Sequence, residues 1–566
     1  MRPAGRGTHD SLYFDYPQFA YREPPEASGD SPRHAVVIVG AGPVGLTAAI
    51  ELGRRGVPCI VLDDKLTVND GSRAICISRS SFETLQQLGV VERFEQKALG
   101  WTRGRTYYRD RLVYRLEMPH SDNERFLPMY NLEQQYIEQF LIERAEQCDG
   151  LVDLRWGSRV AGVEVSDGEV CLTVETADGR YRLRSAWLIA ADGARSAVRS
   201  ALGLRLNGEN LPGHYIIADV LMTHDFPTER RAFFASSANP EATVLVHRQP
   251  DDVWRIDWQI QADDDPRQAV EERRIRERLG DILHMIGHHG PWELEWWSIY
   301  TANTLCLDDY RHGRVLFAGD AAHIVPIFGV RGLNNGLADA VNVAWKLAYV
   351  VQGRAPTALL DSYSPERRGA TLDVFRHAGR SSRFMTPPTR GFRLLRDAAL
   401  QLALSAPFAE RFADPRQVLP YRYADSALMS SDADDWPENA GIRAGEMALN
   451  RRLADGSYLF DHLGPGFTVF YFVSSAAALA RASELRSALS AVAPDLRLLM
   501  ITPGQQCSQY EDRLPDQDNQ AFVGYGAVDG SAYLVRPDRY IAGRWLCADS
   551  KSLTLALERA LGGTSR

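Results

Sequence analysis

The sequence of 566 residues lacks the features that mark several classes of protein. No uninterrupted apolar stretch approaches the ~20 residues that a membrane-spanning helix requires. Residues 1–33 carry charges and prolines where a secretory signal would have an apolar region, so a cytoplasmic protein is expected. Runs of lysine and arginine are missing and the net charge is −9, which argues against nucleic acid or an anionic membrane as a partner.

Cysteine is also sparse and scattered. The seven cysteines stand singly, with no CxxC pair and no grouping of histidine and cysteine at metal-ligand spacing. We therefore expect reduced, mostly structural thiols and no metal. The apolar fraction of 45% and the charged fraction of 24% are ordinary for globular proteins, and at ~150 residues per domain the length predicts several domains.

Glycine, by contrast, is concentrated where it has a chemical meaning. The segment HAVVIVGAGPVGLTAAIELGRRG, residues 34–56, is typical of a strand, a turn and a helix, and CIVL, residues 59–62, of a second buried strand. Such a turn holds a pyrophosphate at the helix N-terminus, and the carboxylate that follows the second strand accepts a ribose hydroxyl. NAD and FAD both remain open at this point. The predicted cofactor-binding residues here are Gly40, Gly42, Pro43, Val44, Gly45, Asp63 and Asp64.

Two later segments decide between these cofactors. They are LIAADGARSAVRSALG, residues 188–203, and RVLFAGDAAHIVPIFGVRGLNNGLADAVNVAWKLA, residues 314–348. With both, the chain resembles the class A flavoprotein monooxygenases, the single-component FAD-dependent aromatic hydroxylases, over at least residues 34–370. The resemblance implies bound FAD, NADH or NADPH as reductant, O2 as co-substrate, and oxygen transfer to a substituted phenol through an adduct at flavin C4a.

The resemblance also assigns residues to the FAD site. Arg73 and Gln134 would lie beside the cofactor, although a surface ion pair and a helix-face residue are the plainer alternatives for these two. Pro326 would border flavin and substrate. The sequence IFGV follows it, where many relatives have a second proline, so the resemblance does not predict the shape of the pocket there. The other residues carried over are Asp192, Gly193, Gly319, Asp320, Gly332, Leu333 and Asn334.

The expected fold class is α/β with an α+β insert. It comprises a Rossmann-like FAD-binding domain of the p-hydroxybenzoate hydroxylase type, a β-sheet substrate domain and a C-terminal thioredoxin-like domain. The C-terminal part resembles that of the phenol hydroxylase and 3-(3-hydroxyphenyl)propionate hydroxylase branch, chiefly in RPDRYIAGRW, residues 536–545. A structural or dimer-related role follows, because CxxC is missing. The predicted boundaries are an arm at 1–33, FAD-binding parts at 34–212 and 306–384, the substrate domain at 213–305, a connection at 385–443, and the last domain at 444–566.

The reactive group of the substrate domain is less defined. A phenol reacts best as phenolate, so a histidine or tyrosine within hydrogen-bond reach would assist. Alternative functions are a tailoring oxygenase, including Baeyer–Villiger insertion, acting on a polycyclic natural product, and a flavin-binding protein without turnover. Expulsion of a ring substituent is a variant of the same chemistry. The candidates for contact with the small aromatic substrate, which we leave unranked, are His214, Tyr215, His247 and Arg255.

Overall fold

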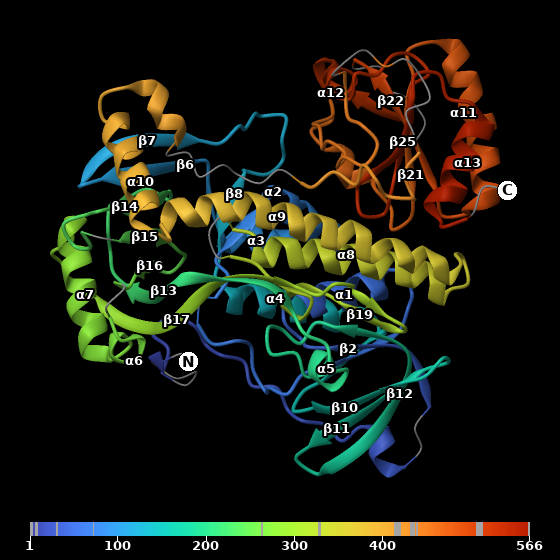
Figure 1. Ribbon diagram of the computed structural model, residues 1–566. Coiled ribbons are helices and arrows are strands. Elements are labelled where there is room, and N and C mark those ends of the chain that lie inside the picture. Colours follow the sequence, from blue (N-terminus) through green and yellow to red (C-terminus); the bar gives the residue numbers. More distant parts are fainter. Residues whose placement is uncertain are drawn as a thin grey trace.

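The computed structural model describes residues 4–5, 10–29, 32–71, 73–240, 242–261, 264–326, 330–412, 420–430, 436, 440–504 and 513–563. Figure 1 shows two sheets joined by the long helices α8 (Gly332–Val351) and α9 (Tyr363–Met385), and a third sheet in a separate C-terminal lobe. Among the described residues, no helix combines the length and the apolar character needed to cross a membrane.

The first sheet is formed by the glycine-rich segment and its neighbours. Its order is β10-β11-β12-β2-β3-β9, with β19 on β12 and β18 on β19. The apolar runs AVVIV and CIVL lie at its centre, where both faces are covered, so their side chains are almost entirely buried. The bounds are β2 Arg33–Val39, β3 Cys59–Leu62, β9 Val152–Arg155, β10 Arg159–Val165, β11 Val170–Thr176, β12 Gly179–Ala190, β18 Arg311–His312 and β19 Val315–Phe317.

Helices α1 (Pro43–Arg54), α4 (Gln134–Glu146) and α8 pack beside this sheet, and α1 contacts both of the others. A separate small sheet has the order β4 (Cys76–Ser78), β8 (Met129–Asn131) and β5 (Leu99–Trp101). The remaining helices of this half are α2 Arg79–Leu88, α3 Val91–Lys97 and α5 Ala197–Ala201.

The second large sheet has the order β1-β17-β13-β16-β15-β14-β6-β7, with β20 on β17. It contains the β-rich segment predicted at 213–305, and it also recruits β6 and β7 from far upstream. Helices α6 (Pro266–Ala269) and α7 (Glu272–Met285) accompany it. The strand bounds are β1 Ala4–Gly5, β6 Arg103–Tyr108, β7 Arg111–Glu117, β13 Asn207–Leu221, β14 Arg230–Phe234, β15 Thr243–Arg248, β16 Val253–Gln259, β17 Glu293–Cys306 and β20 His323–Ile324.

The two faces of this sheet differ because side chains alternate along each strand. The side chains of Trp254, Ile256 and Trp258 on β16 join a buried apolar cluster that includes Ile275 and Leu279 of α7. The alternate positions of β16, Arg255 and Asp257, point to the opposite face. One face is therefore an apolar core and the other is free to line a polar cavity.

The C-terminal lobe has a sheet of order β23-β22-β21-β24-β25. Strands β21 and β22 are parallel and joined by α11, whereas β24 and β25 form an antiparallel pair followed by α13, which contacts α11. The bounds are α10 Arg390–Ala403 in the connection, then β21 Thr468–Phe472, α11 Ala476–Val492, β22 Arg497–Pro503, β23 Arg513–Asp516, α12 Gln520–Tyr525, β24 Ala532–Val535, β25 Ile541–Trp545 and α13 Ser550–Ala560.

The N-terminal arm packs on the body of the protein, as its aromatic residues indicate. The ring of Phe19 stacks on Trp156 with centroids 4.2 Å apart, and Phe14 meets Tyr136 edge-on at 4.8 Å. The main-chain N–H of Phe19 also donates to the carbonyl of Leu66 at 2.8 Å. The arm thus holds the loop that leads to Arg73.

Candidate active site

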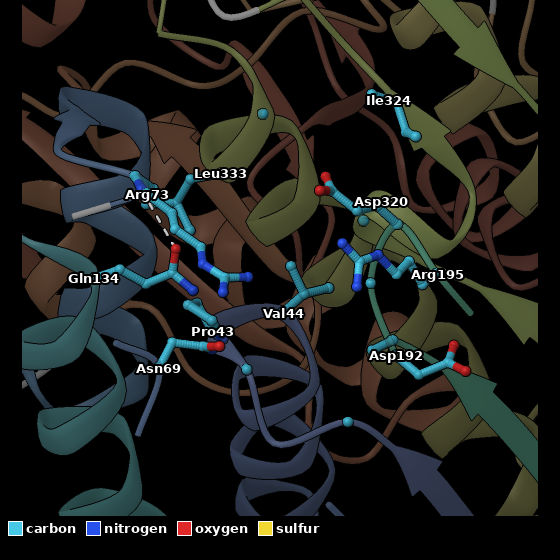
Figure 2. A pocket seen from close by; sticks show the side chains of 18 of the residues that line it. Pro43, Val44, Asn69, Arg73, Gln134, Asp192, Arg195, Asp320, Ile324 and Leu333 are labelled. Atoms are coloured by element: carbon cyan, nitrogen blue, oxygen red, sulfur yellow. Dashed lines mark hydrogen bonds between the residues drawn. The ribbon is translucent and has the colours of Figure 1, made fainter. Parts of the chain in front are cut away.

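A cavity of about 1000 Å³ opens where the two large sheets face each other. One wall is the start of α1 with the loops after the parallel strands, and the other is the polar face of the second sheet. Figure 2 shows Val44, at the start of α1, between Arg73 and Gln134 on one side and Asp192, Arg195 and Asp320 on the other. The parallel strands end at this wall, which is where open α/β sheets bind ligands.

The glycine turn has the geometry of a phosphate cradle. A Cβ on Gly40, whose φ is +105°, would lie 2.4 Å from the carbonyl oxygen of Ala191, and a Cβ on Gly45 would lie 1.9 Å from that of Gly40. Both positions therefore require glycine. A Cβ on Gly42 would meet nothing nearer than Glu138 at 4.0 Å, so the main chain there is open toward the cavity. No side chain caps α1, which leaves its first N–H groups for an anion.

Asp63 has two roles at this wall. Its carboxylate accepts hydrogen bonds from the main-chain N–H of Ala41 at 2.7 Å and of Lys65 at 3.0 Å, and it lines the cavity next to exposed Asp64. Burial raises the pKa of Asp63, although Lys65 opposes the shift. A carboxylate has about four acceptor positions, so capacity remains for a ribose hydroxyl.

The segment 192–199 is tied to the turn around Asp320. Asp192 accepts the N–H of Val198 at 3.1 Å, Ser196 caps α5 by accepting the N–H of Arg199, and Arg199 donates to the carbonyl of Ala321 at 3.0 Å. Gly193 and Gly319 line the cavity beside them. The side chain of Asp320 is exposed to the cavity and makes no hydrogen bond recorded among the described residues, so it is available to a ligand.

Helix α8 begins at the same cavity. Gly332, Leu333 and Asn334 form its first turn, and no side chain caps it. The side chain of Asn334 is occupied, because its amide oxygen accepts the N–H of Ser78 at 2.9 Å and its amide nitrogen donates to the carbonyl of Val330 at 2.7 Å. Only main-chain N–H groups of this turn can therefore face a cofactor. Pro326 lines the cavity beside it.

Arg73 and Gln134 both reach the cavity, and both also show the plainer role that the sequence allowed. Arg73 is exposed and lies 3.4 Å from Asp70 in a surface ion pair. The amide oxygen of Gln134 accepts the N–H of Ala74 at 3.3 Å, and its amide nitrogen donates to Glu138 at 2.8 Å (Figure 2). Gln134 thus fixes the loop that carries Arg73.

The sheet wall separates the four substrate-contact candidates. His247 and Arg255, which are paired across β15 and β16, line the cavity. His214 and Tyr215 are not among its described lining residues. His214 lies opposite Thr301 near the end of the sheet, and the buried hydroxyl of Tyr215 bonds that of Thr386. Tyr215 thus contacts the segment that follows α9, and the geometry gives no support to a part for His214 or Tyr215 in substrate contact.

Sequence reasoning missed three polar residues on this wall: Arg230, Asp257 and Tyr300. Asp257 is the counter-ion of Arg255, with Nη2 to Oδ1 at 3.0 Å and Nε to Oδ1 at 3.1 Å. The hydroxyl of Tyr300 is buried and has no hydrogen-bond partner within the part of the chain that the structure describes. The alternation in VWRIDWQ, where polar residues occupy every second position, is the signal that could have identified this face.

Burial controls protonation on this wall. It lowers the pKa of His247 well below its ordinary value, and the charges of Arg230 and Arg255 lower it further. Burial likewise raises the pKa of Tyr300 well above its ordinary value, with the charge of Asp257 adding to the shift. At neutral pH both side chains are therefore neutral hydrogen-bonding groups.

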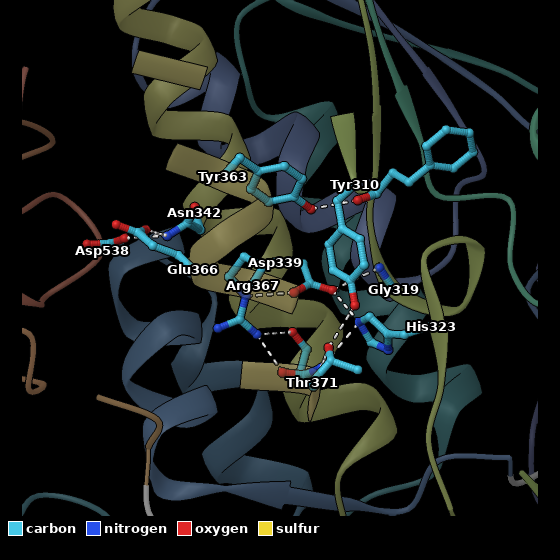
Figure 3. Close-up of polar contacts among 12 residues, drawn as sticks. Tyr310, Gly319, His323, Asp339, Asn342, Tyr363, Glu366, Arg367, Thr371 and Asp538 are labelled. Atoms are coloured by element: carbon cyan, nitrogen blue, oxygen red, sulfur yellow. Dashed lines mark hydrogen bonds and ion pairs between the residues drawn. The ribbon is translucent and has the colours of Figure 1, made fainter. Parts of the chain in front are cut away.

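Behind the cavity lies a network of buried polar groups centred on Asp339, shown in Figure 3. Its carboxylate accepts hydrogen bonds from the N–H of Gly319 at 3.1 Å, from the ring of His323 at 2.6 Å and from Nε of Arg367 at 2.7 Å. These contacts position the turn that carries Asp320. Asp339 lies on the same helix, α8, as Asn334, but it is not among the described residues that line the cavity.

The network continues into the C-terminal lobe. Glu366 on α9 accepts hydrogen bonds from Lys346 at 2.7 Å and from Nη1 of Arg536 at 2.7 Å. Arg536 also pairs with Asp538, which in turn accepts from Asn342 and from the indole N–H of Trp345, each at 3.0 Å. The segment RPD, residues 536–538, thereby docks on the helix whose first turn lies at the cavity.

The glycine turn at Gly40, Gly42 and Gly45 and the cavity beside it have the geometry of a dinucleotide-binding site. A family model described as an FAD binding domain matches residues 33–378, and the chain belongs to this family, as an FAD-dependent aromatic monooxygenase. It is similar to 3-(3-hydroxy-phenyl)propionate/3-hydroxycinnamic acid hydroxylases. The one of Mycobacterium sp. strain JLS is 29% identical, covering 94% of this chain and 93% of the relative, and that of Mycolicibacterium smegmatis is 28% identical, covering 92% of each.

Solved structures agree on the fold. The flavin-dependent monooxygenase PieE, in complex with FAD and substrate, superposes with a TM-score of 0.76 at 22% identity over 94% of this chain and all of that chain. Aklavinone-11 hydroxylase, in a ternary complex with FAD and aklavinone, gives a TM-score of 0.73 at 23% identity over the same shares. Both alignments extend well beyond residues 33–378, so most of the chain shares the fold of these proteins.

Proposed function

We propose that this chain inserts one oxygen atom into the ring of a small substituted phenol, with NADH or NADPH as reductant and O2 as co-substrate. The observation that carries the proposal is a single cavity that runs from the glycine turn to the polar face of the second sheet. The two mycobacterial relatives described above are named for 3-(3-hydroxy-phenyl)propionate and 3-hydroxycinnamic acid, which are single-ring phenols.

The described residues fit FAD. The open main chain at Gly42 and the start of α1 suit the diphosphate. Asp63 suits a ribose. The carboxylate of Asp320, which has no recorded partner among the described residues, suits the ribityl hydroxyls. The first N–H groups of α8 suit the electron-rich edge of the isoalloxazine. The chemistry supplied by bound FAD is acceptance of a hydride from the nicotinamide and activation of O2.

Tyr300 is the residue best placed to orient the phenol. Its hydroxyl is buried at the cavity without a recorded partner, so the hydroxyl of a substrate would satisfy it. As a neutral group it can donate to the developing phenolate. We expect Tyr300→Phe to lower kcat more than substrate affinity, and to shift the pH dependence of kcat.

The test begins with the purified yellow protein. NADH or NADPH is added with a panel of phenols, and nicotinamide oxidation, oxygen consumption and product mass are followed together. We expect aromatic-stimulated oxidation and a product heavier by one oxygen atom on the ring. Absence of stimulation across single-ring and polycyclic panels would overturn the proposal, and oxygen insertion without a new ring hydroxyl would indicate Baeyer–Villiger chemistry.

We further infer that the C-terminal lobe is a thioredoxin-like domain with a structural role. The parallel pair β21 and β22 joined by α11, followed by the antiparallel pair β24 and β25 and then α13, supports this assignment. The docking of Arg536 and Asp538 on α8 and α9 supports the structural role. A homodimer, a cytoplasmic location and the domain boundaries given above remain predictions.

A further inference from the structure

Arg230 presents a charge that the described residues do not balance. Its side chain is only 8% exposed, it lines the cavity, and no hydrogen bond or ion pair is recorded for it among the described residues. Its Nε is buried without a partner. Burial lowers the pKa of this guanidinium, with Cys76 and Asp257 giving only partial compensation. A buried charge of this kind is costly unless a counter-ion arrives.

The neighbouring charges are already paired. Arg255 engages Asp257 through two nitrogen atoms, and Arg231, the next residue of β14, pairs with Glu229 at 2.6 Å. Strands β14 and β15 are antiparallel, and Arg231 is paired with Val246. Continuing this register by one residue brings His247 opposite Arg230. The Nδ1 atom of His247 is also buried, and no described residue serves as its hydrogen-bond partner. This corner of the cavity therefore holds one unmatched positive charge and a neutral hydrogen-bonding group.

We propose that Arg230, assisted by His247, binds a carboxylate on the side chain of the substrate. The inference rests on the proposed function and narrows it, since it specifies an aromatic acid rather than any phenol. A guanidinium presents two parallel N–H groups that match the two oxygens of a carboxylate, and the pair is strongest where water is excluded. Tyr300, on the other side of β16, would then meet the ring hydroxyl at the opposite end of the substrate.

The experiment compares two ligands that differ in charge but little in shape. Binding of 3-(3-hydroxyphenyl)propionate and of uncharged 3-propylphenol to the FAD-loaded protein is measured by perturbation of the flavin absorbance and by calorimetry. Arg230→Met should weaken the acid by roughly 30-fold or more and leave 3-propylphenol nearly unchanged. Arg230→Lys, which keeps the charge but loses the planar fork, should fall between wild type and Arg230→Met.

Arg231→Met is the matched control. Arg231 is adjacent, buried and charged, but it points to the other face, lies over the ring of Phe226 and does not line the cavity. Its loss should not change the preference for the acid. FAD content and the unfolding midpoint of each variant show whether the protein is folded.

Two results would overturn the inference. One is a wild-type protein that binds the acid no better than 3-propylphenol. The other is an equal loss of both ligands in Arg230→Met, which would indicate that Arg230 contacts the ring hydroxyl instead. Binding is measured without turnover. Failure of the inference about Arg230 is therefore distinguishable from failure of the proposed oxygenation, which would appear as no stimulation of nicotinamide oxidation by either ligand.

Discussion

The polar groups on the wall of the cavity and those in the network behind it differ in how many partners they have within the protein. Behind the wall, Asp339, Arg367 and Glu366 are each paired through several short contacts. On the wall, Asp320 and Arg230 have no recorded partner among the described residues. Paired charges fix geometry, whereas unpaired ones next to a cavity are available to ligands. The comparison predicts that substitutions behind the wall change stability, and that substitutions on it change binding.

The largest effect on stability is expected for Asp339→Asn. The substitution leaves Arg367 buried without its counter-ion and weakens the acceptor for the N–H of Gly319, at a cost of about 3–5 kcal/mol. Urea unfolding of the FAD-free protein measures the loss, and flavin absorbance per polypeptide measures the retained cofactor. An unchanged free energy of unfolding would contradict the prediction that the paired network behind the wall stabilises the protein.

The second prediction concerns acid, which should reduce the stability that Glu366 contributes to the buried network. Burial alone would raise the pKa of Glu366, but Arg536 and Lys346 hold it well below its usual range. A carboxylate with a depressed folded-state pKa contributes stability above its unfolded pKa of about 4.3, and loses it as the pH falls toward the folded value. The stability gap between wild type and Glu366→Gln should therefore narrow from about pH 6 to about pH 3, as measured by urea midpoints. A constant gap would contradict this.

Asp63 shares features of the paired network and of the unpaired groups on the wall. Its carboxylate accepts a hydrogen bond from the glycine turn, and it also lines the cavity. We expect Asp63→Ala to lose about 1–3 kcal/mol of FAD affinity, with a smaller loss of stability in the FAD-free protein. Equilibrium dialysis against FAD gives the first value and urea unfolding the second. If neither value changes, the carboxylate is merely solvated.

A surface pair sets the baseline for charge removal. Arg93 and Glu143 lie 3.1 Å apart with side chains 50% and 38% exposed. Glu143→Gln should change the unfolding free energy by at most about 1 kcal/mol and leave FAD binding intact. A larger change would mean that exposed pairs in this protein cannot serve as a reference.

Asp320→Ala should have the smallest effect on stability and the greatest on the cofactor. Since Asp320 has no recorded protein partner, its removal should leave the urea midpoint of the FAD-free protein unchanged. Its loss should nevertheless give colourless protein after purification, because the ribityl contact is lost. Full FAD affinity in this variant would refute the role assigned to Asp320.

Much of the cofactor side could be predicted because each motif is local. The strand, turn and helix of residues 34–62 are encoded by neighbouring residues, and the glycines at 40 and 45 stand where a Cβ would collide with main chain. Even here the structure refined the reading, since the side chain of Asn334 is bound within the protein and Arg73 shares its charge with Asp70.

The substrate side could not be predicted in the same way, because its residues come from separate strands. Arg230, His247, Arg255 and Tyr300 share one face only through the register of β14, β15, β16 and β17, and a shift of one residue would turn each away. His214 and Tyr215 lie on β13 of the same sheet, but neither is among the described residues that line the cavity, and the hydroxyl of Tyr215 bonds that of Thr386. The sequence by itself therefore determined the dinucleotide turn, through contacts between neighbouring residues, and its resemblance to a known family over two later segments implied FAD. Only the tertiary structure decided which polar side chains face the substrate site. The pairing of strands that are far apart in the sequence determines which charged groups form ion pairs within the protein and which line the cavity without a recorded partner.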